Sequence, residues 1–127
     1  MLRSLAISLL LLAAPASPGV VVVYSRLDAE QASKAASLLR LTTPVFMDVN
    51  MPPGVLWRSE VHRELCAATW VLLVWSKNAQ ASVEVGHEWR AALECGRAVV
   101  PLLLDETLPP SPLLERQWID WKPLVRP

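Results

Sequence analysis

Polar side chains follow directly on the apolar runs of this sequence and are well placed to do chemistry. Ser25 and Arg26 follow the first run, and Asp48, Ser76 and Asp105 follow later ones. Hydroxyl, guanidinium and carboxylate groups hydrogen-bond to polar ligands, and an arginine also pairs with phosphate. The alternative is that each run needs a polar residue where the chain leaves the core. If the runs are parallel strands, these residues gather at one sheet edge, where open α/β sheets bind ligands.

The elements that must position these residues alternate between strand and helix. Apolar runs without alternation, such as 19–24, are typical of strands buried on both faces. Strands are expected at 19–24, 44–48, 69–75, 97–104 and 117–121, and helices at 28–40, 57–68 and 82–95. This alternation predicts right-handed βαβ crossovers. The expected fold is a flavodoxin-like, three-layer α/β sandwich with a five-stranded parallel sheet and helices on both faces.

Composition and missing motifs exclude several classes. The 127 residues are 53% hydrophobic, and 12 basic residues balance 12 acidic ones, so neither disorder nor nucleic-acid binding is expected. The glycines form neither a G-x-G-x-x-G turn nor a G-x-x-x-x-G-K-[ST] phosphate loop. Cys66 and Cys95 are too few for a disulfide framework and lack zinc-ligand spacing. No metal site is expected, and His62 and His87 are interpreted as surface or helix-packing residues.

Residues 1–18 form an apolar leader. Arg3 precedes the apolar stretch 5–14, and Ala14-Pro15-Ala16 resembles a signal-peptide cleavage site. As a helix this stretch covers about 15 Å, too little to span a ~30 Å hydrocarbon core. A cleaved leader, a short membrane-associating segment and an apolar extension of a cytosolic protein all remain open. A cytoplasmic location is expected, with secretion or membrane association through 1–18 as the alternative.

Four segments share their motifs and their order with one known family. They are VVVVYSRLD (20–28), VFMDVNMPPGVLWRSEVHREL (45–65), ATWVLLVWSKNAQASVEVGHEWRAAL (68–93) and RAVVPLLLDETLPPSPLLERQWIDW (97–121). The second contains a Pro-Gly loop ahead of a W-[RK]-x-x-[IV] helix start, and the last ends in a Q-W-I-D motif. Together they resemble a bacterial-type Toll/interleukin-1 receptor (TIR) domain, which implies such a domain over 19–125.

Some TIR domains are enzymes that cleave NAD+ at the nicotinamide–ribose bond, and the resemblance implies this activity in signalling or defence. The family's glutamate ends the pattern S-x-W-[CV]-x-x-E, and Ser82, Val85 and Glu88 occupy the matching positions. Glu84 stands where the family usually has tryptophan, so an aromatic wall that could stack on a planar base is missing. The Cβ atoms of Glu84 and Glu88 are expected to lie about 6 Å apart, so the two carboxylates repel when both are charged.

The resemblance implies roles for the candidate site residues. Glu88 would be catalytic, because a carboxylate stabilises the positive charge that develops on the ribose; the alternative is a solvated helix carboxylate. Ser25 and Arg26 would meet the pyrophosphate, with a surface role equally open for Arg26. Ser82 would bind a ribose hydroxyl or the nicotinamide amide, or would only cap its helix. NAD+ enters as substrate, and no cofactor or metal is implied.

The region around the Pro-Gly loop carries the remaining candidates. Asp48 would bind ribose, and Trp57 would either contact the substrate or anchor its helix. The resemblance implies that the loop inserts into a neighbouring TIR domain, in a head-to-tail assembly that activates the enzyme. This assembly loop consists of Met51, Pro52, Pro53 and Gly54.

Two other functions remain open. A non-enzymatic TIR adaptor, working through homotypic contacts, is favoured by Glu84 in the tryptophan position and by the intact assembly loop. A nucleotide- or nucleoside-handling flavodoxin-like protein of another family is the third hypothesis, although its phosphate loop is missing. TIR domains usually end in a helix after the fifth strand, but only 122–127 remain here, with two prolines. The last helix is therefore expected to be absent, or the chain to be truncated.

Overall fold

The structure, a computed structural model, describes residues 19–47 and 57–125, without the side chain of Trp57. Its strands are β1 (Val20–Val23), β2 (Val45–Phe46), β3 (Trp70–Trp75), β4 (Val99–Leu103) and β5 (Ile119–Asp120). All neighbouring pairs are parallel, and the order β2-β1-β3-β4-β5 makes one five-stranded sheet. This doubly wound order confirms the expected flavodoxin-like class.

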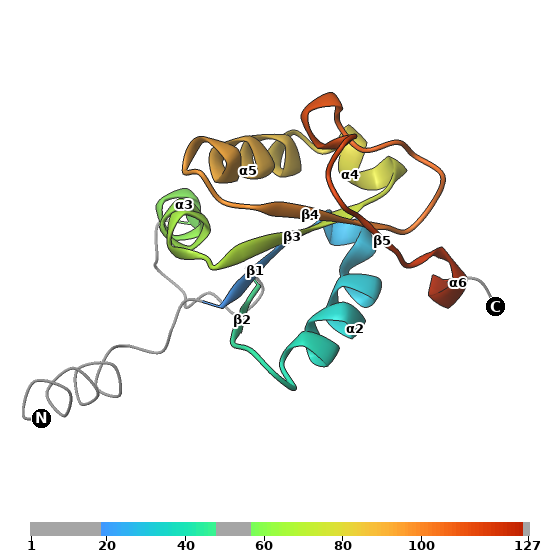
Figure 1. The fold of residues 1–127 in the computed structure, drawn as a ribbon, viewed down its shortest axis with the longest axis horizontal. Helices are drawn as coiled ribbons and strands as arrows, with labels where there is room; N and C mark the ends of the chain where they lie inside the picture. The colour runs from blue at the N-terminus through green and yellow to red at the C-terminus, as the bar shows by residue number, and fades with distance from the viewer. Residues whose placement is uncertain (1–18, 48–56, 126–127) are drawn as a thin grey trace, which may run out of the picture.

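Helices cover the sheet on both faces (Figure 1). They are α2 (Ala29–Leu39), α3 (Trp57–Ala67), α4 (Lys77–Ala81), α5 (Val83–Glu94) and α6 (Lys122–Val125), with single 3₁₀ turns η1 (Arg26–Asp28) and η3 (Ser111–Leu113). The helices α3, α4 and α5 lie on one face, and α2 lies on the other. The segments 57–68 and 82–95 therefore lie together on the same side of the sheet.

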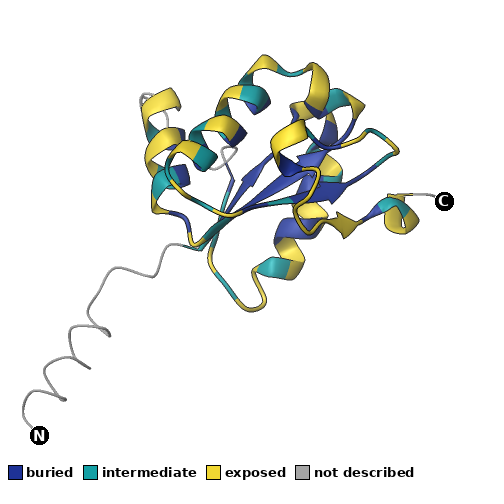
Figure 2. Cartoon of the chain, turned by 45° about the horizontal axis from the view of Figure 1, so that its top comes forward, coloured by how far each residue is buried: buried dark blue, intermediate teal, exposed yellow. Residues whose placement is uncertain are grey.

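The strands β1, β3 and β4 are apolar because both of their faces are largely buried, as Figure 2 shows. Val21 and Val23 face the core under α3 and α5, whereas Val20 and Val22 face the core over α2. Side chains of successive strand residues point to opposite faces, so a strand covered on both sides cannot alternate with polar residues.

Local capping fixes the ends of α5. The hydroxyl Oγ of Ser82 accepts a hydrogen bond from the backbone N–H of Val85 (3.2 Å), which caps the helix at its N-terminus. At the other end Gly96 adopts φ 73°, and its N–H donates to the carbonyl of Leu93 (2.9 Å). Glycine reaches this left-handed conformation without steric cost, so the chain can leave the helix there.

Three short elements differ from the expectation. The helix α4 is an extra turn, started by Ser76, whose Oγ accepts from the N–H of Ala79 (3.1 Å). The strand β5 is reduced to two exposed residues, and the single turn α6 follows it. Within the described ranges no helix is both long and apolar enough to cross a membrane.

Candidate functional site

A buried polar cluster joins the ends of β1 and β3. The Oγ of Ser76 donates a hydrogen bond to Oδ2 of Asp28 (2.5 Å), and Nδ2 of Asn78 donates to Oδ1 (2.9 Å). Asp28 and Ser76 are both buried, so these bonds satisfy groups that would be costly to leave unpaired. From the sequence, Asp28 was predicted only as the start of a helix, because its hydrogen-bond partners lie about 50 residues away in the chain.

Asp105 likewise serves the protein itself. Its Oδ2 accepts from the backbone N–H of Lys77 (3.0 Å) and its Oδ1 from that of Thr107 (2.9 Å). Partial burial raises the pKa of Asp105, but these hydrogen bonds and the Lys77 charge outweigh it and lower the pKa below the ordinary 3.8. Asp105 and Ser76 thus fit the structural alternative for polar residues at strand ends.

A cleft of about 530 Å³ opens beside this edge, between the exit of β1 and the first turns of α3 and α5. Among the described residues it is lined by Tyr24, Ser25, Arg26, Arg58, Ser82, Glu84 and Glu88. Four of the six predicted catalytic and substrate-binding residues, far apart in sequence, therefore meet around one hollow: Ser25, Arg26, Ser82 and Glu88.

The two serines of the cleft, Ser25 and Ser82, both accept capping hydrogen bonds from the backbone. The Oγ of Ser25 is buried and accepts from the N–H of Leu27 (3.3 Å), as Ser82 does from Val85. Accepting a bond uses a lone pair and leaves the hydroxyl hydrogen as a donor. Capping and ligand binding are therefore compatible at both serines.

An ion pair that the sequence did not predict crosses the cleft. Arg58 Nη2 of α3 lies 2.9 Å from Glu84 Oε1 of α5, with the two side chains 74% and 42% exposed. The expected repulsion between Glu84 and Glu88 is countered by this arginine. Sequence patterns place Arg58 in a helix start but do not say which helix lies beside it.

Glu88 lies one helical turn after Glu84 and is half-buried. It lines the cleft and also a second hollow of about 430 Å³ between α3 and α5, bordered by Arg58 and His62 among others. Its side chain is thus at a concave surface and not on the outer face of the helix. Asp48 and the assembly loop 51–54 lie outside the described residues, and so does the side chain of Trp57, which begins α3.

A family model for the TIR domain matches residues 20–124. The chain belongs to the TIR domain family. Its fold is similar to the TIR domain of the Toll-related receptor TRR-2 from the lower metazoan Hydra magnipapillata, with TM-score 0.70 and 17% identity over 80% of this chain and 82% of that one. It is also similar to a 2-deoxyribosyltransferase from the psychrotolerant bacterium Bacillus psychrosaccharolyticus, with TM-score 0.63 and 16% identity over 84% and 90%. No curated protein matches the sequence significantly.

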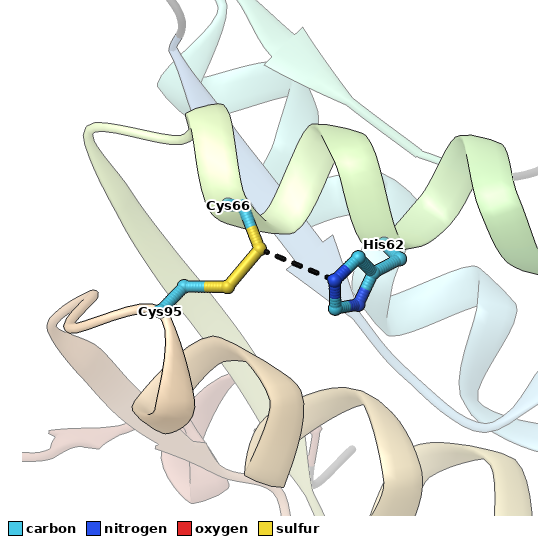
Figure 3. Close-up of side chains that lie close together, drawn as sticks. All are labelled: His62, Cys66 and Cys95. Atoms are coloured by element: carbon cyan, nitrogen blue, oxygen red, sulfur yellow. Dashed lines mark hydrogen bonds between the residues drawn. A yellow bond between two sulfur atoms is a disulfide. The ribbon is translucent and has the colours of Figure 1, made fainter.

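This TIR domain also contains a covalent link that sequence reasoning missed. Cys66, at the end of α3, and Cys95, just after α5, form a disulfide with a Cα–Cα distance of 5.3 Å, beside His62 (Figure 3). The helices α3 and α5 run side by side in the same direction, so their C-terminal ends lie next to each other. Counting cysteines cannot detect this, because the pairing depends on the packing of two helices. Two cysteines were predicted to be too few for a disulfide framework, and this single link between two helices was not anticipated.

Proposed function

We propose that this TIR domain is an NAD+ glycohydrolase that cleaves the nicotinamide–ribose bond in signalling or defence. One observation carries the proposal: Glu88 lines the same cleft as Ser25, Arg26 and Ser82, which come from two different parts of the fold. A site assembled from separate strand ends and helix starts is the usual form of ligand site in a doubly wound sheet.

The size and charge of the cleft support a dinucleotide substrate. Small-molecule sites enclose about 300–1,000 Å³, and this cleft has about 530 Å³. Arg26 and Arg58 both line it and would pair with the two negative charges of a pyrophosphate. Arg58 must then leave Glu84, which costs little because exposed ion pairs contribute about 0–1 kcal/mol.

The bond cleavage itself asks little of the protein. As the ribose C1′–N bond breaks, its electron pair goes to the nicotinamide nitrogen, so a cationic ring departs neutral and needs no acid. Positive charge develops on the ribose, and the Glu88 carboxylate stabilises it electrostatically. Water then adds to C1′ and loses one proton to solvent, giving ADP-ribose. The hydroxyls of Ser25 and Ser82 would hold the ribose or the amide in place.

The structural likeness to a 2-deoxyribosyltransferase gives fold-level support. That enzyme's description names the transfer of a deoxyribosyl group in nucleoside synthesis, which is chemistry at a sugar–base bond. At 16% identity the likeness concerns the fold alone, so it adds only that a fold of this kind can host this class of reaction.

The direct test is nicotinamide release. The full chain at high concentration is incubated with NAD+, and nicotinamide is quantified by chromatography. Glu88→Gln keeps the side chain's shape but removes its charge, so we expect at least a hundredfold loss of rate. Glu94→Gln is the matched control, because Glu94 lies exposed at the far end of the same helix and should leave the rate unchanged. No release by the wild type, or an undiminished rate in Glu88→Gln, would refute the proposal.

The second candidate is a non-enzymatic adaptor that binds other TIR domains. Its specific support is Glu84, which replaces the family's tryptophan and joins Arg58 across the cleft. It predicts concentration-dependent self-association in sedimentation velocity, lost on substitution of Pro53 or Gly54, with NAD+ unchanged throughout. Association together with NAD+ cleavage would instead favour an enzyme activated by assembly.

The proposed substrate favours the cytoplasm, where NAD+ is abundant. Glutathione and thioredoxin keep thiols reduced in that compartment, so Cys66 and Cys95 would be largely free thiols there. Export through residues 1–18 is the alternative, and it would preserve the disulfide. Alkylation of free thiols in freshly lysed cells, read by mass spectrometry, distinguishes the two.

A further inference from the structure

His62, Cys66 and Cys95 bring three metal-ligating atoms together at the C-terminal ends of α3 and α5. All three atoms lie within 4.8 Å of one another, and Nε2 of His62 is 3.6 Å from Sγ of Cys66. Figure 3 shows the imidazole of His62 turned toward Cys66, with Cys95 approaching from the other helix. These residues lie away from the strand-end cleft lined by Ser25 and Ser82.

The helix spacing makes two of the ligands a natural pair. His62 and Cys66 are four residues apart, so they lie on one face of α3 in successive turns. In a tetrahedral zinc site, with bonds of about 2.0–2.1 Å to nitrogen and about 2.3 Å to sulfur, a nitrogen and a sulfur ligand lie about 3.6 Å apart. The observed separation of 3.6 Å therefore already suits a shared metal.

The third ligand is held by the turn that ends α5. Gly96 takes φ 73°, and the N–H of Arg97 donates to the carbonyl of Ala92 (2.9 Å). The Nε of Arg97 also donates to the carbonyl of Cys95 (3.2 Å), so the backbone on either side of the cysteine is fixed. The Cα atoms of Cys95 and Cys66 stay 5.3 Å apart, close enough for both sulfurs to reach one ion after their bond is broken.

We propose that the reduced chain binds one soft divalent metal ion of the zinc class through Nε2 of His62 and the Sγ atoms of Cys66 and Cys95. Thiolate and imidazole together are the ligand set that zinc prefers. His62 is exposed and both cysteines are half-buried, so the fourth position opens to solvent. None of the three ligands lines the strand-end cleft. The metal-site proposal therefore does not depend on whether the chain cleaves NAD+.

The disulfide and the metal site are alternative states of the same sulfurs. A dithiol reductant gives two electrons and two protons to the disulfide, becoming a disulfide itself and leaving two protein thiols. The metal ion then replaces both thiol protons, releasing two protons per ion bound. Oxidised protein cannot bind the ion in this way, since neither sulfur is then a thiolate.

Cobalt(II) is the probe that tests this site, because thiolate-to-cobalt charge transfer absorbs in the near ultraviolet. The full chain is reduced with a phosphine, freed of it without air, and titrated with Co²⁺ and then with Zn²⁺. We expect a thiolate band that saturates at one equivalent, release of two protons per ion, and loss of the band when Zn²⁺ displaces Co²⁺. The oxidised chain should give no band.

Variants assign the ligands. Cys66→Ser and Cys95→Ser should each reduce the thiolate band by about half or abolish it, and His62→Ala should weaken binding at least tenfold. The control is His87→Ala, which removes the only other histidine and should bind as the wild type does. Circular dichroism of each apo protein verifies that it is folded. The absence of a band in reduced wild type, or equal affinity in His62→Ala and wild type, would overturn the proposal.

Discussion

The helices α3 and α5 lie side by side, and their two ends are joined by opposite kinds of bond. At the N-terminal end, beside the cleft, the exposed ion pair Arg58–Glu84 joins them. At the C-terminal end a disulfide joins Cys66 to Cys95. An exposed pair exchanges readily with solvent or a ligand, whereas a covalent bond does not. The C-terminal ends of α3 and α5 are therefore covalently linked, whereas their N-terminal ends, beside the cleft, are joined only by an exchangeable ion pair.

The energetic contrast follows from elementary estimates. The disulfide closes a loop with a sequence separation of 29 residues. The chain-entropy model gives such a link about 3–4 kcal/mol of stabilisation. The ion pair at the other end contributes about 0–1 kcal/mol. The difference means that Arg58 can separate from Glu84 without loosening the core between the helices.

Breaking the disulfide should produce the largest effect. In metal-free buffer, reduction by a phosphine should lower the free energy of unfolding of the wild type by about 3 kcal/mol, because the unfolded chain regains the loop's freedom. Urea unfolding with and without reductant measures this. The double variant Cys66→Ser/Cys95→Ser is the control, and the reductant should not change its free energy of unfolding. Equal free energies of unfolding for the oxidised and the reduced wild type would show that the disulfide does not stabilise the C-terminal ends of α3 and α5 more than the ion pair stabilises their N-terminal ends.

Removing the buried carboxylate of Asp28 should come next. Asp28→Ala leaves the Ser76 hydroxyl and the Asn78 amide without their acceptor in a buried place, which should cost about 2 kcal/mol. Asn78→Ala removes only one bond and should cost about half as much. This pair tests how much the buried cluster at the sheet edge stabilises the fold. A change below about 0.5 kcal/mol in Asp28→Ala, in the same urea assay, would show that the cluster contributes little.

The N-cap of α5 should have a smaller effect. Ser82→Ala removes the acceptor for the Val85 N–H and should cost about 1 kcal/mol. Ser82→Thr keeps a hydroxyl at the cap and should recover most of that stability. Measured beside nicotinamide release, the two variants separate capping from substrate contact. A rate lost in Ser82→Ala at a temperature where the variant stays folded, and restored in Ser82→Thr, would indicate contact as well.

The fold could be predicted from the sequence because its signals are local. Continuous apolar runs located the four strands β1 to β4, and the Ser82 cap located α5 to within one residue at each end. The strand β5 was overestimated because only two of its residues pair with β4. The turn α4 escaped notice because it depends on one capping serine, Ser76.

The site could be predicted only in part, for a physical reason. Ser25 and Arg26 were predicted from the end of a strand, and Ser82 and Glu88 from the family pattern. The parallel sheet and α5 bring all four to one cleft. The Arg58–Glu84 pair and the Cys66–Cys95–His62 cluster depend instead on which two helices lie side by side. No periodicity or motif within either helix specifies its lateral neighbour.

The ion pair at the cleft end should contribute little. Arg58→Ala should change the free energy of unfolding by no more than about 0.5 kcal/mol, since both partners are exposed. Whatever change there is should shrink in 1 M salt, where the screening length falls to about 3 Å. Arg63→Ala, which breaks the neighbouring pair with Glu60 within α3, is the matched control. A loss of more than about 2 kcal/mol in the free energy of unfolding of Arg58→Ala would mean that the ion pair stabilises the helix pair nearly as much as the disulfide does.

Asp105 should give the smallest effect, seen only in acid. Its pKa is lowered in the folded chain by hydrogen bonds from Lys77 and Thr107, so the charged carboxylate favours folding above the ordinary pKa of 3.8. That contribution is lost as the pH falls through the lowered folded value. Asp105→Asn should therefore be slightly less stable than wild type at pH 6 and should lose less stability on acidification toward pH 3. The urea midpoints of variant and wild type at both pH values measure the difference. If acidification shifts both midpoints by the same amount, the hydrogen bonds that Asp105 accepts do not stabilise the start of α4.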